Sequence, residues 1–131
     1  MYDWRDYLEI SKEFLSSCIA QPPNRLRKET MLRTAISRAY YAAFHRSNDY
    51  LKTYGFRPSE QSVHRSVIEK IDSYVHNGEV KISSDLDRAF VSRKKADYND
   101  SLTGLEKEAE ITIERAKTII KEIDTRKAGP Y

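Results

Sequence analysis

Apolar residues recur every three or four positions along almost the whole chain, which is the spacing of an amphipathic α-helix. This pattern predicts five helices, over about 3–20, 25–54, 61–75, 84–99 and 103–123. The short alternation Val80-Lys81-Ile82 does not extend far enough to predict a strand. We therefore expect an all-α fold, an up-and-down bundle of four to five helices around one core, in a single domain over residues 1–131.

Residues that can cap helices support these boundaries. Asn24 can accept a hydrogen bond from the first turn of the second helix, and Gly55 can take the left-handed conformation that ends it. Ser84-x-x-Asp87 resembles a capping box and Thr103-x-x-Glu106 matches one, so we expect them to start the fourth and fifth helices. The segment from His76 to Ser83 is expected to be a loop.

The composition is that of one packed domain. Of the 131 residues, 33% are charged and 39% are hydrophobic, so the chain is polar but has enough apolar material for a single core. No apolar stretch approaches the roughly 18 residues of a membrane span, and the acidic N-terminus does not have the form of a secretory signal. We expect a cytoplasmic protein that does not enter a membrane, with the single cysteine, Cys18, as a small core residue.

The common motifs of metal and nucleotide chemistry are missing from the sequence. His45, His64 and His76 form neither an HExxH pair nor a Cys/His cluster, and the chain contains no GxxxxGK[ST] or GxGxxG. We therefore expect no metal and no cofactor. The net charge is +3 and the basic residues are spread along the chain, which argues against a dedicated binder of duplex DNA but is compatible with RNA or nucleotide contact.

Two charged residues continue the apolar stripe of the fourth predicted helix. At about 100° per residue, Arg93 and Asp97 follow the apolar residues Leu86, Ala89 and Phe90 on one face. The i,i+4 spacing puts the arginine within reach of the aspartate, and a buried charge is costly unless it is paired. Two interpretations remain open: an internal ion pair that orients the helix, or a polar site at a cleft or a dimer seam.

The long second helix has two faces that can pack. One face is apolar and should lie in the core; it carries Leu32, Ile36, Ala39, Ala43 and Tyr50. The other carries Arg38, Tyr41, Ala42 and His45, where the small side chain of Ala42 would let another helix approach closely. Arg38 and His45 are either functional groups on this second face or ordinary residues at the rim of the core.

The string Ser37-Arg-Ala-Tyr-Tyr-Ala-Ala-Phe-His45 resembles the second-helix signature of HEPN (higher eukaryotes and prokaryotes nucleotide-binding) domains. The small stand-alone prokaryotic members of this family are the most similar. The resemblance continues in Asp3-Trp-Arg-Asp-Tyr-Leu8, in His64 and in Arg93-x-x-Ala96-Asp97-Tyr98, so it spans nearly the whole chain in the right order. It implies a HEPN-like helical bundle, commonly a homodimer.

The resemblance also implies a range of functions: RNA cleavage, nucleotide binding, or pairing with a small nucleotidyltransferase in toxin–antitoxin and defence modules. Catalytic members carry Arg-x(4–6)-His, in which the histidine serves attack by the 2′-hydroxyl of the RNA and the arginine stabilises the developing phosphorane charge. Arg93 corresponds to that arginine. Tyr98, Asn99 and Asp100 occupy the histidine window, so the base would have to come from His45 or His64 through helix packing.

We therefore predict a protein that binds RNA or a nucleotide as part of a toxin–antitoxin or defence module with a nucleotidyltransferase partner. Its polar centre would comprise Arg38, Tyr41, Asp97 and Tyr98, and the resemblance also suggests Tyr98 as the acceptor of a transferred nucleotidyl group. One alternative is a metal-independent endoribonuclease toxin that uses Arg93 or Arg38 with His45 or His64. A second alternative is a non-catalytic helical adaptor.

Overall fold

The computed structural model describes residues 3–20, 24–75 and 82–125. They form five α-helices, α1 (Arg5–Ala20), α2 (Arg25–Thr53), α3 (Val63–Lys70), α4 (Ile82–Tyr98) and α5 (Leu105–Asp124), with a single 3₁₀ turn, η1 (Ile71–Ser73), after α3. No strand occurs in the described part of the chain. The prediction of an all-α bundle is confirmed.

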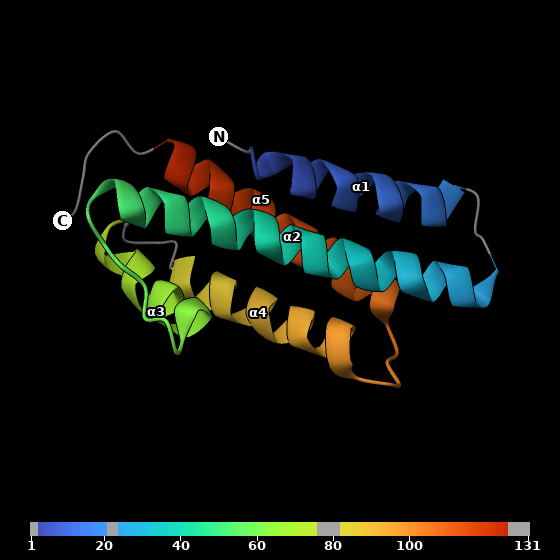
Figure 1. Cartoon of the computed structure of the whole chain (residues 1–131). Coiled ribbons are helices and arrows are strands. Elements are labelled where there is room, and N and C mark those ends of the chain that lie inside the picture. Colours follow the sequence, from blue (N-terminus) through green and yellow to red (C-terminus); the bar gives the residue numbers. More distant parts are fainter. Residues whose placement is uncertain (1–2, 21–23, 76–81, 126–131) are drawn as a thin grey trace.

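The long helix α2 is the centre of the bundle. It packs against α1, α4 and α5, while the short α3 closes one end against α2 and α4. Successive long helices run in opposite directions, so that α2 and α5 are parallel neighbours (Figure 1). Because α2 has neighbours on several sides, both of its predicted packing faces are used.

Small side chains allow this close packing around α2. Ala35, Ala39, Ala42 and Ala43 are completely buried, and their lack of bulk lets the neighbouring helices approach the α2 backbone. The predicted core face of α2 is buried throughout, as is Cys18 on α1, which confirms both expectations. By contrast, the apolar residue Ile19 near the end of α1 is 53% exposed.

The ends of α2 follow local sequence rules. The Asn24 side chain accepts a hydrogen bond from the Arg27 amide at 3.0 Å, which is the predicted N-cap. At the other end Gly55 has φ +89°, and the Phe56 amide donates to the Leu51 carbonyl at 3.1 Å, so the left-handed glycine ends the helix as predicted.

The predicted starts of three later helices are wrong. α3 begins at Val63 and not at Gln61, and it gives way to η1 after Lys70. α5 begins after Gly104, which has φ +67° and occupies the N-cap position that the capping box assigned to Thr103. A left-handed glycine redirects the chain at that point, and this shifts the helix start by one residue.

The start of α4 shows how a distant residue can decide a helix end. α4 begins at Ile82, so the expectation of a loop up to Ser83 and a cap at Ser84 is wrong for the described residues, and residues 76–81 lie outside them. Both carboxylate oxygens of Asp72 in η1 accept hydrogen bonds from Ser83, from its amide at 2.9 Å and from its hydroxyl at 2.6 Å. This carboxylate satisfies a first-turn donor that the local sequence would otherwise have to cap.

None of the described helices combines the length and the apolar character that crossing a bilayer would need.

Candidate functional site

Tyr41, in the middle of α2, brings together residues from three helices. Its hydroxyl accepts a hydrogen bond from Arg93 on α4, whose guanidinium carbon lies 5.0 Å from the centroid of the tyrosine ring. The His45 ring lies 5.8 Å from the same centroid and the His64 ring of α3 lies 5.9 Å from it. We call Tyr41, His45, His64, Arg93 and Asp97 the Tyr41 cluster. Tyr41 is therefore a common neighbour of the predicted arginine and of both predicted histidines.

The predicted pair between Arg93 and Asp97 is present. Arg93 Nε lies 3.0 Å from Asp97 Oδ2, and the two side chains are 13% and 29% exposed. Nε is a buried donor without a hydrogen bond in the described residues, so the contact is an ion pair by distance and is not aligned as a hydrogen bond. Asp97 Oδ2 also lies 3.4 Å from the Ser37 hydroxyl on α2, which donates to it. The pair therefore joins α4 to α2 at the rim of the core.

His64 is enclosed by aromatic rings. It stacks on Phe90 of α4 at 5.0 Å between centroids, with Phe44 of α2 at 4.4 Å, and its Nδ1 lies 2.6 Å from the hydroxyl of Tyr40. Burial lowers the pKa of His64, and the positive charge of Arg93 lowers it further. Burial also raises the pKa of Tyr40, so that its hydroxyl keeps its proton and can donate to the Nδ1 of a neutral imidazole.

His45 has a different environment. Its ring stacks on the indole of Trp4 on α1, with centroids 3.7 Å apart and planes at 17°. Burial lowers the pKa of His45, which favours the neutral form near pH 7. Neither of its ring nitrogens has a hydrogen-bond partner among the described residues, whereas His64 uses Nδ1 to hold Tyr40. Of the two histidines, His45 is therefore the one with both nitrogens available for proton transfer.

The remaining predicted residues lie at the margins of the cluster. The guanidinium carbon of Arg38 lies 4.9 Å from the ring centroid of Tyr7 on α1. Tyr7 in turn packs edge-on against Trp4, which stacks on His45, so these two aromatic rings connect Arg38 to the cluster. Tyr98 ends α4 with its side chain 72% exposed, and the Arg93 guanidinium carbon lies 5.8 Å from its ring centroid.

Sequence reasoning missed three partners of the site. They are Trp4, which stacks on His45, Tyr40, whose hydroxyl bonds to His64, and Ser37, which donates to Asp97. Periodicity can show that such residues are buried, but it does not show which polar atom they face. Only the resemblance had singled out the region of Trp4 and His64. No three His, Cys, Asp or Glu side chains of the described chain are grouped closely enough to hold a metal ion.

Comparison with known proteins identifies the family of the chain. The HEPN domain profile matches residues 4–126 of the chain. A protein of Methanocaldococcus jannaschii named "Putative toxin MJ0605" is 31% identical over 125 residues, which cover 88% of this chain and 87% of that protein. The profile match includes every residue of the Tyr41 cluster. The chain therefore belongs to the HEPN domain family.

Proposed function

We propose that this HEPN protein binds RNA or a nucleotide at the Tyr41 cluster, as part of a toxin–antitoxin or defence module that includes a nucleotidyltransferase. The observation that carries the proposal is the convergence of an arginine and two histidines on Tyr41, from three different helices. The toxin name of the Methanocaldococcus relative supports the same kind of module. In solution we expect a homodimer, in which two such clusters face one another.

The chemistry of the cluster suits a phosphate with an attached base. An arginine presents several N–H donors in a planar fork that matches phosphate oxygens, and such charge-assisted hydrogen bonds are strong. The exposed ring of Tyr98 beside Arg93 offers a surface on which a nucleobase can stack. Asp97 holds Arg93 from the inner side, which orients the guanidinium before any ligand arrives.

Binding is tested with a fluorescently labelled single-stranded RNA and, separately, with nucleotides, by anisotropy and by calorimetry. We expect Arg93→Gln to weaken binding roughly tenfold or more, since a charge-assisted hydrogen bond contributes about 1.5–3 kcal/mol. Lys107→Gln is the matched control because it removes one positive charge from an exposed position on α5. Equal losses in the two variants would show that only the overall charge matters and would contradict a site at Arg93.

A second function, metal-independent endoribonuclease activity, is favoured by the state of the histidines. A neutral imidazole can accept the proton of a 2′-hydroxyl, and burial lowers the pKa of both His45 and His64 toward that state. Arg93, which shares Tyr41 as a neighbour with both histidines, would stabilise the charge that develops on the phosphate. Since both nitrogens of His45 are available, we assign it the base role in this alternative.

The test is cleavage of RNA in excess chelator, with analysis of the products for cyclic-phosphate ends. We expect His45→Ala and Arg93→Ala to abolish cleavage while circular dichroism shows that both remain folded. His64→Ala serves as a comparison that removes the imidazole already bonded to Tyr40. If the wild-type dimer binds RNA but leaves it intact, the protein is a binding module and the endoribonuclease assignment is wrong.

A further inference from the structure

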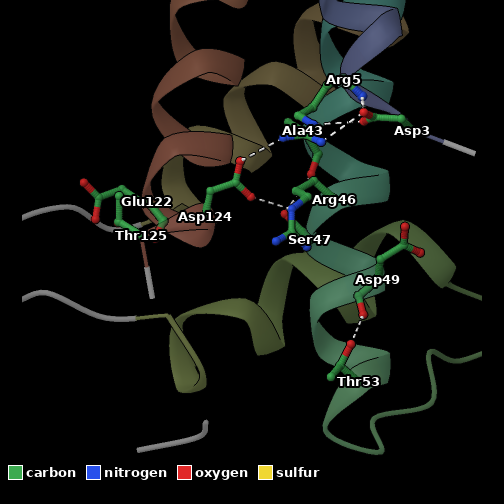
Figure 2. Close-up of polar contacts among 10 residues, drawn as sticks. All are labelled: Asp3, Arg5, Ala43, Arg46, Ser47, Asp49, Thr53, Glu122, Asp124 and Thr125. Atoms are coloured by element: carbon green, nitrogen blue, oxygen red, sulfur yellow. Dashed lines mark hydrogen bonds and ion pairs between the residues drawn. The ribbon is translucent and has the colours of Figure 1, made fainter. Parts of the chain in front are cut away.

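One carboxylate, that of Asp124 at the end of α5, contacts two arginines from two other helices. Its Oδ1 lies 2.7 Å from Arg46 Nε on α2, and its Oδ2 lies 3.9 Å from Arg5 Nη1 at the start of α1. Arg5 is held in addition by Asp3, whose carboxylate accepts from the Arg5 amide at 3.0 Å and from Nε at 2.9 Å. Figure 2 shows the Asp124 carboxylate between the two arginines. We call Asp3, Arg5, Arg46 and Asp124 the ionic clasp.

The ionic clasp lies next to the stack of Trp4 on His45, both at the start of α1 and along α2. On α1 the clasp residue Arg5 directly follows Trp4, and on α2 the clasp residue Arg46 directly follows His45. The stack and the clasp thus occupy adjacent positions on both chain segments. Trp4 lies over His45, and the following arginines meet at Asp124. A displacement of the first turn of α1 would break both contacts together.

Two physical arguments indicate that this arrangement does more than stabilise the individual helices. The first turn of a helix is where fraying starts, and Trp4 precedes the first residue of α1. Asp124 is the last residue of α5, where a negative charge opposes the helix dipole and is locally unfavourable. A residue that destabilises its own helix but bridges two other helices indicates that the contact between those helices is important.

We propose that Asp124 is a positioning residue for the candidate site: through Arg5 and Arg46 it holds the start of α1 on α2, and so keeps Trp4 stacked on His45. This inference rests on the proposed function for its consequence, since His45 belongs to the Tyr41 cluster. With Trp4 in place, one face of the His45 ring is covered by the indole. Without it, that face would be open to solvent and only Tyr41 and Phe44 would restrain the imidazole.

The sequence offers a direct probe of this contact, because Trp4 is the only tryptophan. A protonated imidazole in contact with an indole quenches its fluorescence, so the emission of Trp4 reports both the stack and the protonation of His45. We expect the wild-type emission to show a quenching step as the pH is lowered through the range in which His45 titrates. His45→Gln should remove that step, which assigns it.

Asp124→Asn tests the positioning role without removing a packed side chain, and it relieves the unfavourable charge at the end of α5. We expect the variant to remain folded, to emit at longer wavelength and to lose most of the pH-dependent quenching step. Arg46→Gln removes the shorter ion pair from the other side and should give the same spectral change. An Asp124→Asn protein with wild-type emission and a wild-type quenching step would overturn the proposal.

Glu106→Gln is a matched control at the other end of the same two helices. Glu106 pairs with Lys28 at 3.2 Å, so this is again an α2–α5 ion pair of similar exposure. Lys28 precedes Arg46 by 18 positions, and Glu106 precedes Asp124 by 18, which places the control pair about 27 Å away along the bundle. We expect its Trp4 emission and quenching step to equal those of the wild type.

The RNA-binding assay separates this inference from the proposed function. If the wild type binds RNA, Asp124→Asn should weaken binding severalfold and Glu106→Gln should not. If the wild type does not bind RNA, the proposed function fails, while the fluorescence comparison still decides whether Asp124 positions Trp4. A spectral change in Asp124→Asn with unaltered RNA binding would support the clasp but refute its role in the site.

Discussion

The hydrogen bond between Tyr40 and His64 allows a test in which two damaging substitutions should repair each other. Tyr40 is fully buried, and its hydroxyl lies 2.6 Å from His64 Nδ1. His64→Phe keeps an aromatic ring between Phe44 and Phe90 but leaves the buried hydroxyl of Tyr40 without this partner. Tyr40→Phe keeps the core ring and leaves His64 Nδ1 without its donor. A buried polar group that loses its partner costs about 1–3 kcal/mol, so each single variant should be destabilised by that amount.

The double variant is expected to be more stable than either single variant. When both partners of a buried hydrogen bond become apolar groups of similar shape, neither a donor nor an acceptor is left unsatisfied, and the net cost can be close to zero. We therefore expect the Tyr40→Phe/His64→Phe protein to lie within about 1 kcal/mol of the wild type, with a coupling energy of about 1–3 kcal/mol between the two sites.

Urea and thermal unfolding measure this double-mutant cycle. For a chain of this size, 1 kcal/mol corresponds to about 3–5 °C in melting temperature, so the single variants should melt about 3–15 °C below the wild type. Tyr98→Phe is the control, because Tyr98 is 72% exposed and its loss of a hydroxyl should leave stability unchanged. Additive losses in the double variant would refute the reasoning, since they would mean that the hydroxyl and the imidazole contribute independently.

Three further predictions concern pH, the cap of α4 and covalent modification. Because burial lowers the pKa of His45 and His64 below 6.5, the unfolded chain binds more protons as the pH falls, and the free energy of unfolding should decrease between about pH 7 and pH 5. The His45→Gln/His64→Gln protein should show a flatter profile in urea titrations, and a wild type that gains stability on acidification would contradict this. Asp72→Ala should lower the free energy of unfolding by about 1–2 kcal/mol in thermal melts by uncapping α4, whereas Ser84→Ala should change it little. A larger loss in Ser84→Ala than in Asp72→Ala would show that the local capping box caps α4. Incubation with the nucleotidyltransferase proposed as its partner and ATP should add nucleotide mass to Tyr98, and equal modification of Tyr98→Phe would exclude that residue as the acceptor.

Much of the fold was determined by the sequence alone. Apolar spacing is a local property of the chain, so it predicted five helices, the buried face of α2 and the buried Cys18. The caps of α2 were equally predictable, because Asn24 and Gly55 act on backbone groups within three or four residues of themselves. The Arg93–Asp97 pair belongs to the same class, since i,i+4 neighbours meet on any helix.

The tertiary structure decided what these elements do together. The cap of α4 comes from Asp72, which lies 11 positions before the residue that it binds, so no local rule could place it. Tyr41 and His45 were predicted on one face of α2, and His45 and His64 as alternative bases, but the contacts of these residues and of Trp4 depend on how α1, α2 and α3 cross. Periodicity specifies which side of a helix is buried, but the register and angle between helices come from the fit of all side chains at once. For that reason the sequence identified the residues of the candidate site, and only the packed bundle showed that they share one tyrosine.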